Sequence, residues 1–241
     1  MRADVFLVEQ GYAKSRSEAQ AAIKAGLVRA NGEALSKPSQ TIAADAVIAY
    51  AKTHPYVSRG GVKLAAALDH FGLSPEGRIC LDLGASTGGF TQVLLQRGAA
   101  RVYALDVGHG QMDRSLMQDP RVSVQDGVNV RDLTSADLPR PVSAITADLS
   151  FISLKLALPP ALALADAGAW AVVLVKPQFE VGRQAVGKGG IVRDDAVRLA
   201  AVSGMEEFLA AQSGWQVLGH IQSPIAGGDG NTEYLLAARK S

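Results

Sequence analysis

The segment that constrains the fold most is ICLDLGASTGGFTQVLLQRG, residues 79–98. An apolar strand runs into Gly84, and a helical pattern begins near the glycine pair at 88–89. Glycines in such a turn let a ligand approach the backbone, and the first turn of the helix leaves its N–H groups free. Because strand-like and helix-like runs alternate along the rest of the chain, we expect an α/β fold whose parallel sheet binds a ligand beyond the carboxyl ends of its strands.

The glycine spacing does not match a dinucleotide-binding motif. That motif requires G-x-G-x-x-G, and Ser86 occupies the position of its second glycine. Asp82, near the end of the strand, would repel a pyrophosphate but suits a cationic amino-acid head group. The spacing favours such a ligand, with NAD or another nucleotide as the competing interpretation.

Two further strands end in side chains that suit a nucleoside. ARVYALDVG (100–108) ends in Asp106, whose carboxylate can accept from both ribose hydroxyls, and VSVQDGVNVRDL (122–133) places Asp126 and Asn129 to meet an adenine. An amine, a ribose and an adenine without phosphates describe S-adenosylmethionine. The residues expected to contact this cofactor are Asp82, Gly84, Ala85, Ser86, Gly88, Gly89, Phe90, Asp106, Asp126 and Asn129.

Four charged residues stand where apolar runs begin or end. Asp148 follows a strand-like run in ITADLSFISL (145–154), and Lys176 follows another in VLVKPQF (173–179). Lys63 lies on one face of the helix predicted in SRGGVKLAAAL (58–68), and Glu233 begins the last strand in GDGNTEYLLAAR (228–239). We expect Asp148 and Lys176 to point into the ligand crevice, because both follow strand ends. A purely structural ion pair is the alternative.

Charge is uneven along the chain. Residues 1–60 carry eight Lys or Arg and five Asp or Glu, a net charge of +3, so the remainder carries −2 of the total of +1. A small basic module joined to a larger one suits nucleic-acid binding. Composition alone does not decide this, because three extra charges also arise by chance.

The local pattern in this basic segment is more specific. A first helix is predicted to end near Gly11, with an apolar face made of Val5, Leu7, Val8 and Tyr12. Ser15 and Glu18 form a capping box for a second helix. Asn31 and Gly32 then form the turn of a hairpin.

The segment GYAKSRSEAQAAIKAGLVRANGEALSKPS (11–39) resembles the small RNA-binding fold shared by a ribosomal small-subunit protein, pseudouridine synthases and tyrosyl-tRNA synthetases. The resemblance implies a small α+β RNA-binding domain with its linker at residues 1–57, followed by the larger domain at 58–241. The basic residues around its helices and hairpin are then candidates for RNA contact: Lys14, Arg16, Lys24 and Arg29.

Lys63, Asp148, Lys176 and Glu233 resemble the Lys-Asp-Lys-Glu tetrad of the FtsJ-type ribose 2′-O-methyltransferases. The segments YVSRGGVKL, DLGASTGGFT, DLSFISL, VKPQFEVGR and GNTEYL resemble one branch, the TlyA family, in the same order along the chain. The resemblance implies a Rossmann-like S-adenosylmethionine-dependent domain that methylates the 2′-hydroxyl of a cytidine in ribosomal RNA, within ribosomal subunits. The modified cytidine, the subunit and the oligomeric state stay open.

The resemblance gives each member of the tetrad a role. A ribose hydroxyl is a poor nucleophile, so the implied base, Lys176, must be neutral when it takes the proton. Burial and the second ammonium at Lys63 both favour the neutral form. Asp148 is expected to orient Lys176, and Glu233 to hold Lys63 or the ribose.

Further basic residues are candidates for RNA contact in the large domain. KPQFEVGRQAVGKGGIVRDD (176–195) is predicted to be a loop near the catalytic strand, with Arg183 and Lys188 at phosphates. Arg59, beside a glycine pair at the domain junction, is a similar candidate. A solvated surface loop is the alternative.

Other classes of protein are disfavoured. The single cysteine, Cys80, excludes a disulfide framework, and the histidines have no metal-ligand spacing. The apolar run at 154–176 contains Asp166 and a proline pair, which argues against a membrane span. No signal peptide is apparent at the start, so we expect a cytoplasmic protein. A hemolysin-like protein and a non-catalytic RNA-binding protein are the competing functions.

Overall fold

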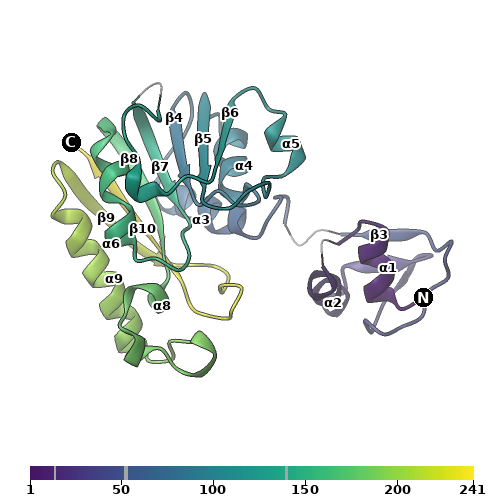
Figure 1. Ribbon diagram of the computed structural model, residues 1–241. Helices are drawn as coiled ribbons and strands as arrows, with labels where there is room; N and C mark the ends of the chain where they lie inside the picture. The colour runs from purple at the N-terminus through teal and green to yellow at the C-terminus, as the bar shows by residue number, and fades with distance from the viewer. Residues whose placement is uncertain (14, 52–53, 139–140) are drawn as a thin grey trace. The chain divides into compact units, whose positions relative to one another are not determined.

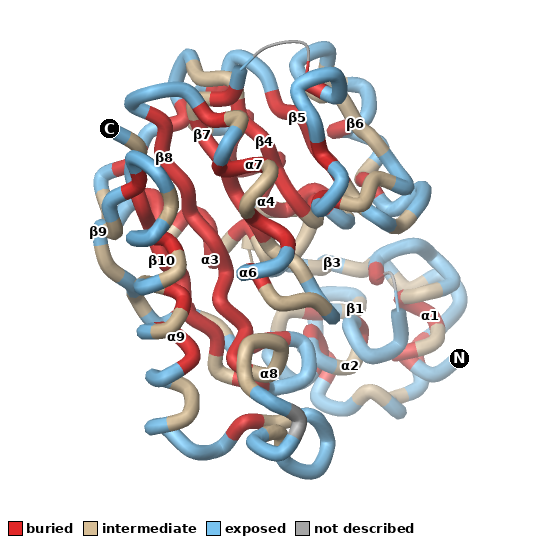
Figure 2. Tube along the Cα trace, turned by 60° about the vertical axis from the view of Figure 1, so that its left-hand side comes forward, coloured by how far each residue is buried: buried red, intermediate tan, exposed pale blue. Residues whose placement is uncertain are grey.

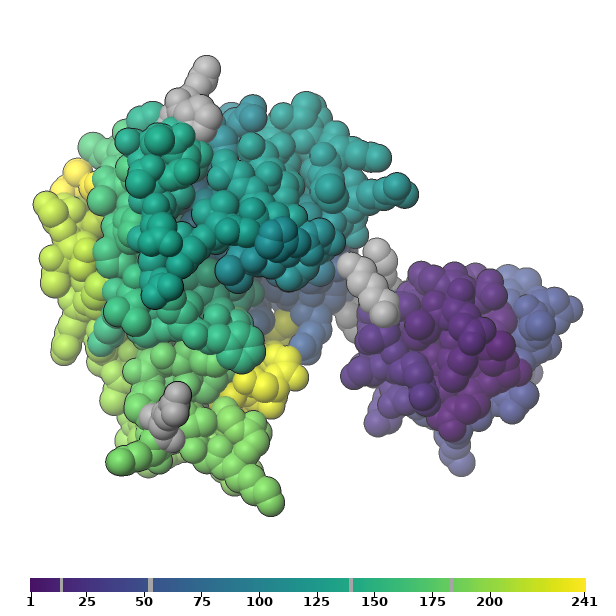
Figure 3. All heavy atoms as spheres, viewed as in Figure 1, coloured from purple at the N-terminus to yellow at the C-terminus, as the bar shows by residue number. Residues whose placement is uncertain are grey.

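The computed structural model describes residues 1–13, 15–51, 54–138 and 141–241, without the side chain of Arg183. The chain divides into two compact units, Met1–Pro55 and Tyr56–Ser241 (Figure 1). The sequence places this boundary two residues later, after residue 57. Figure 3 draws the heavy atoms of both units as spheres.

The small unit is an α+β fold. It contains α1 (Ala3–Glu9), α2 (Arg16–Lys24) and an antiparallel sheet in the order β2-β1-β3, with β1 (Val28–Ala30), β2 (Glu33–Ala34) and β3 (Ile48–Tyr50). The Ser15 hydroxyl caps α2 by accepting from the backbone N–H of Glu18 at 3.2 Å. Asn31 and Gly32 have φ of 51° and 84°, as the two-residue turn between β1 and β2 requires.

The buried face of α1 differs from the predicted one. Phe6 and Leu7 are buried together with Ala3, whereas the side chain of Tyr12 is exposed. The helix ends at Glu9, so Tyr12 lies beyond it. Ala3, Phe6 and Leu7 have the i, i+3, i+4 spacing of one helical face, and they pack on the α2 residues Ala19, Ala22 and Ile23.

The described part of the large unit is built on a seven-stranded sheet in the order β6-β5-β4-β7-β8-β10-β9. Its strands are β4 (Ile79–Leu83), β5 (Arg101–Asp106), β6 (Val122–Asp126), β7 (Val142–Ala147), β8 (Ala165–Val175), β9 (Trp215–Gln222) and β10 (Tyr234–Lys240). Strands β4 to β8 are parallel to one another, and β10 is antiparallel to both β8 and β9. Figure 2 shows that the central strands are buried along most of their length.

Helices cover both faces of this sheet (Figure 1). The helices are α3 (Gly60–Phe71), α4 (Gly89–Gln96), α5 (Arg114–Met117), α6 (Leu154–Ala157), α7 (Pro159–Ala163), α8 (Pro177–Glu180) and α9 (Asp195–Ala210), with 3₁₀ turns at Val130–Asp132, Arg183–Ala185 and Lys188–Gly190. One core contains residues of α3 and α4, and the other contains residues of α6, α7 and α9. The predicted Rossmann-like α/β class is therefore confirmed.

The apolar run at 154–176 forms two short helices and strand β8. Strand β8 contains an irregularity where Gly168 has φ of 76° and the pairing with β7 shifts register. None of the helices in the described part of the chain is both long and apolar enough to cross a bilayer. Cys80 is buried in β4, and burial raises the pKa of its thiol to about 12.

Candidate active site

The site lies where the order of the parallel strands reverses. Strand β4 has β5 on one side and β7 on the other, so the connections that follow β4 and β7 leave in different directions. This arrangement opens a crevice at the carboxyl ends of the strands. The connections meet there, because the backbone N–H of Asp148 donates to the carbonyl of Leu83 at 2.9 Å.

Gly84 permits this close approach. It has φ of 76°, and a Cβ atom at this position would lie 2.5 Å from the carbonyl oxygen of Asp148. Gly88 and Gly89 are packed in the same way, against Met112 and Ser58. The loop after β4 therefore packs directly on its neighbours because these positions carry no side chain.

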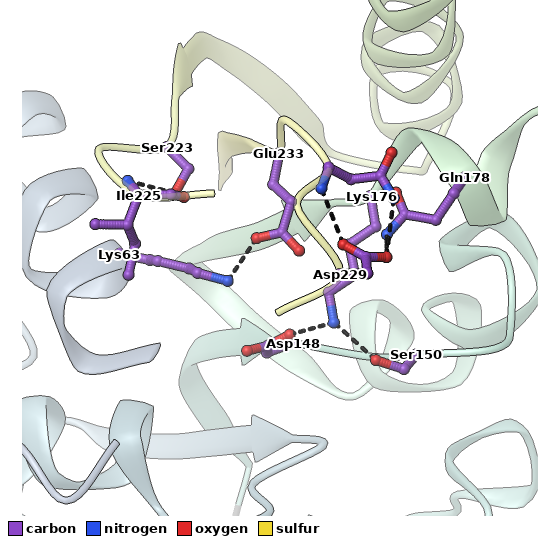
Figure 4. A network of polar contacts seen from close by, with 10 residues as sticks. Lys63, Asp148, Ser150, Lys176, Gln178, Ser223, Ile225, Asp229 and Glu233 are labelled. Atoms are coloured by element: carbon purple, nitrogen blue, oxygen red, sulfur yellow. Dashed lines mark hydrogen bonds and ion pairs between the residues drawn. The ribbon is translucent and has the colours of Figure 1, made fainter. Parts of the chain in front are cut away.

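The structure brings the four charged residues together as two ion pairs (Figure 4). Lys63 Nζ lies 2.5 Å from Glu233 Oε2, and Lys176 Nζ lies 2.7 Å from Asp148 Oδ1. They come from α3, the start of β10, and the ends of β8 and β7. The side chains of Lys63, Glu233 and Lys176 are 10%, 4% and 11% exposed, whereas that of Asp148 is 24% exposed.

Two pockets adjoin these ion pairs. The first, of about 240 Å³, is lined by Ser58, Arg59, Gly60, Lys63, Gly84, Ala85, Ser86, Thr87, Gly89, Phe90 and Asp148. The second, of about 470 Å³, is lined by Ser150, Phe151, Lys176, Gln178, Phe179, Val186, Gly189, Gly190, Gly228, Asp229 and Glu233. Each ion pair has one partner on the first pocket and one on the second. The two pairs therefore stand between the pockets.

Asp106, at the end of the neighbouring strand β5, binds the backbone of the loop that follows β4. Its carboxylate accepts from the backbone N–H of Ser86 at 2.8 Å and from that of Gly108 at 2.7 Å. The Ser86 hydroxyl donates to Gln111 at 2.9 Å. These contacts hold Ser86 at φ of 46°, a conformation that is uncommon for residues other than glycine.

Asp126 and Asn129 lie after the outer strand. Asp126 pairs in register with Asp106 and accepts from the backbone N–H of Gly110 at 2.7 Å. Asn129 caps a 3₁₀ turn, and its Oδ1 accepts from the backbone N–H and the Nε of Arg131. Asp126 is thus exposed at the sheet edge, whereas the oxygen of Asn129 is already used in its own turn.

The predicted contact between Asp82 and a ligand head group is corrected. Asp82 is fully buried, and its two oxygens accept from the hydroxyls of Thr91 at 2.6 Å and Thr146 at 2.9 Å. Burial raises the pKa of this carboxyl to about 6. Thr91 belongs to α4 and Thr146 to β7, so the side chain of Asp82 is enclosed between these two elements. It supports the loop from beneath and does not line the pocket.

The comparisons with known proteins agree with this geometry. FtsJ-like methyltransferases match residues 56–240, and the S4 domain matches residues 1–48. A protein from Mycobacterium tuberculosis, named 16S/23S rRNA (cytidine-2'-O)-methyltransferase TlyA, is 45% identical over 99% of this chain and 89% of its own. The chain belongs to the TlyA branch of the FtsJ-like methyltransferases. The predicted family is therefore confirmed.

Solved structures are similar as well. A candidate hemolysin from Streptococcus thermophilus has a TM-score of 0.80 and 42% identity, covering 100% of this FtsJ-like chain and 88% of its own. A candidate S-adenosylmethionine-dependent methyltransferase from Listeria monocytogenes has a TM-score of 0.56 at 16% identity, covering 76% of this chain and all of its own. The second similarity concerns the fold alone.

Two aromatic residues of this FtsJ-like chain were not predicted. The side chain of Phe151 is 92% exposed, and its ring lies 5.3 Å from that of Phe179. Both line the second pocket, and Phe151 has φ of 65°. Each lies three residues after the charged residue that ends a predicted strand, which is Asp148 for Phe151 and Lys176 for Phe179. That position was the available signal.

Ser150 was also missed. Its hydroxyl accepts from Lys176 Nζ at 2.8 Å, beside the ion pair with Asp148. The serine lies two residues after Asp148 on the connection that follows β7, and it lines the second pocket. A serine in a loop carries no sequence signal of this kind, because the contact depends on how two strand ends meet.

The candidate RNA contacts fall into different settings. In the S4 unit Lys24, Arg29 and Arg16 are exposed, and Arg16 is also bound to the buried carboxylate of Asp4 at 3.0 Å. Asp4 also accepts from Arg2 and Gln20. These contacts, the strongest from Arg2, hold the pKa of Asp4 well below its usual range. Arg16 therefore has a structural partner of its own.

The remaining candidates lie in the methyltransferase unit or outside the described residues. Lys188 is exposed in its 3₁₀ turn, and Arg59 lines the first pocket. Lys14 lies outside the described residues, as does the side chain of Arg183.

Proposed function

We propose that this protein transfers a methyl group from S-adenosylmethionine to the 2′-hydroxyl of a cytidine in ribosomal RNA. The observation that carries the proposal is the pair of buried ion pairs standing between two pockets. Methyl transfer needs this layout, because donor and acceptor must meet at one point from separate sites. The relative named as a rRNA (cytidine-2'-O)-methyltransferase, similar over 99% of the chain, supports the substrate.

The first pocket and the adjoining sheet edge suit the cofactor. Asp148 presents a partly exposed carboxylate there, which suits a cationic ligand, and α4 begins at the same pocket without a side-chain cap. Each oxygen of Asp106 accepts one N–H and can still accept a ribose hydroxyl. Asp126, the next acid along the edge, suits the adenine amine. When bound, the sulfonium group supplies an electrophilic methyl.

The second pocket suits the acceptor nucleotide. Lys176 lies at the pocket wall, where a neutral amine takes the proton of a ribose hydroxyl as that oxygen attacks. Asp148 pairs with Lys176, and Glu233 pairs with Lys63, so the buried charges are paired. The exposed ring of Phe151, backed by Phe179, offers an apolar face on which a base can stack.

The basic residues of the small unit suit the RNA backbone. Lys24 and Arg29 are exposed, and the S4 match gives the unit the class of an RNA-binding domain. Phosphate contacts position an RNA without reading its sequence. We therefore assign RNA affinity to this unit and methyl transfer to the other. The proposed substrate is the RNA of ribosomal subunits in the cytoplasm.

The test is methyl transfer by the purified protein. Ribosomal subunits isolated from cells lacking the gene are incubated with the protein and labelled S-adenosylmethionine, and the modified nucleotides are mapped and identified. We expect label on the 2′-oxygen of cytidine, and none with Lys176→Ala. Label on a base, or equal label with Lys176→Ala, would contradict the proposal.

A further inference from the structure

Lys176 makes two polar contacts at the end of β8. Its Nζ lies 2.7 Å from Asp148 Oδ1 and 2.8 Å from Ser150 Oγ (Figure 4). Ser150 accepts a hydrogen bond, whereas Asp148 Oδ1 is an ion-pair partner without one. Both groups belong to the connection after β7, so the side-chain nitrogen of Lys176 is held by the end of the neighbouring strand.

The hydrogen bond to Ser150 matters for proton transfer. A lysine nitrogen has three positions besides its bond to carbon. In the neutral amine two positions carry hydrogens and the third carries the lone pair. The hydrogen bond to Ser150 directs one of these hydrogens, whereas Asp148 Oδ1 meets the nitrogen as an ion-pair partner without a hydrogen bond. With the ion pair alone, the amine can rotate about its last carbon–nitrogen bond, and the lone pair points elsewhere for part of the time.

The connection that carries Ser150 is anchored at both ends. At its start the backbone N–H of Asp148 donates to the carbonyl of Leu83 at 2.9 Å. At its end Glu180 accepts from the hydroxyl of Ser153 at 2.6 Å and from the backbone N–H of Leu154 at 2.8 Å. Glu180 closes α8, which begins directly after Lys176. The second anchor therefore ties the serine's connection to the helix that follows the lysine.

The residue after Ser150 supports the same conclusion. Phe151 has φ of 65°, a conformation that costs free energy for a residue with a bulky side chain. Such a conformation persists only where the surrounding contacts hold it. The backbone around Ser150 is therefore held in one shape, with its hydroxyl at Lys176 and the Phe151 ring in the second pocket.

We propose that Ser150 is a positioning residue, whose hydroxyl fixes the lone pair of Lys176 in the direction of the acceptor oxygen. The inference rests on the proposed function, because it assigns a role to Lys176 as the base. Ser150 itself takes no proton from the RNA. Its loss should slow the chemical step while leaving the binding of both substrates as it is.

The test compares Ser150→Ala and Ser150→Thr with the wild type. Single-turnover methylation of ribosomal subunits is measured at saturating cofactor, together with the RNA concentration at half-maximal rate, cofactor affinity and melting temperature. We expect the maximal rate of Ser150→Ala to fall about ten- to a hundredfold, the loss typical of a misplaced reacting group. RNA and cofactor affinity should stay within about twofold of wild type. Ser150→Thr keeps a hydroxyl and should recover most of the rate.

Ser203→Ala is the matched control, because Ser203 is exposed on α9. An unchanged maximal rate in Ser150→Ala would overturn the inference while wild-type transfer upholds the proposed function. A slow Ser150→Thr with a lowered melting temperature would also overturn it, since that result describes a structural role. No transfer by the wild type would overturn the proposed function, and the role of Ser150 with it.

Discussion

At the scale of single residues, Lys176 separates two interpretations of the site. As a base it must become neutral during turnover, whereas as a partner of Asp148 it need only stay charged. Arginine distinguishes them, because a guanidinium pairs with a carboxylate but does not release its proton at working pH. We expect Lys176→Arg to lose methyl transfer by at least about a hundredfold, the scale of general-base catalysis. Single-turnover methylation by the folded variant measures this, with melting temperature as the control for folding. Substantial turnover would leave Lys176 an electrostatic role only.

Asp82 gives a prediction about stability. Its folded-state pKa of about 6 lies above the ordinary value of 3.8, because burial disfavours the carboxylate. The stability from its protonated form is therefore complete below about pH 4 and is lost as the pH rises through 6. Asp82→Asn removes this dependence. Relative to wild type, the free energy of unfolding of the variant should rise by about 2 kcal/mol between pH 4 and pH 7. Denaturant unfolding at both pH values checks this, and a constant difference would contradict it.

The sequence predicted the four ion-pair residues because each is a charge at the edge of an apolar run, and the parallel sheet gathers strand ends at one edge. It did not predict the buried hydroxyl partners of Asp82, and it placed that carboxylate in the pocket. The direction of a side chain at the end of a strand depends on which helix packs over that strand. Here the helix is α4, and its Thr91 donates a hydrogen bond to Asp82. Ser150 and Phe151 were missed for a related reason, since the shape of a loop is set by its anchors.

At the scale of elements, the packing of the loop between β4 and α4 requires glycines, because a Cβ atom would collide with neighbouring atoms. In Gly84→Ala a Cβ would lie 2.5 Å from the Asp148 carbonyl oxygen and would also force a left-handed conformation on alanine. Gly77→Ala is a matched control, because Gly77 also has positive φ but meets no atom within 4 Å. Both variants should lose about 1 to 2 kcal/mol of stability from the backbone. We expect only Gly84→Ala to bind S-adenosylmethionine at least about tenfold more weakly by calorimetry. Equal affinities of the two variants for S-adenosylmethionine would show that the loop accommodates the added methyl group at residue 84.

Periodicity predicted the elements better than it predicted their faces. The capping box at Ser15 and the turn at Asn31 and Gly32 were correct, because both are set by neighbouring residues. The apolar face of α1 was wrong. An apolar residue beyond the helix end, Tyr12, was counted in its pattern, and the true face depends on how α1 packs against α2.

At the scale of the whole molecule, the proposed function assigns RNA affinity to the small unit and the chemistry to the large one. Lys24, Arg29 and Arg16 are exposed in the small unit, but Arg16 is also bound to Asp4. Replacing Arg16 would therefore disturb folding as well as binding, because Asp4 is buried and would lose a partner. The informative variant is the double substitution of Lys24 and Arg29 by alanine in the full chain.

This variant should bind ribosomal RNA more weakly and with a shallower dependence on salt. Each phosphate contact releases a counterion, so losing two contacts should reduce the slope of log affinity against log salt by roughly 1.5. The control replaces Arg101 and Arg239 with alanine. Arg101 begins β5, and Arg239 is near the end of the antiparallel strand β10. Both therefore lie at the end of the sheet opposite to the strand ends that precede Asp148 and Lys176. Titration of RNA at several salt concentrations measures the slopes, and calorimetry should give wild-type affinity for S-adenosylmethionine in both variants. If the slope changed equally in both, net charge alone would govern RNA binding, and the small unit would not be the RNA-binding element.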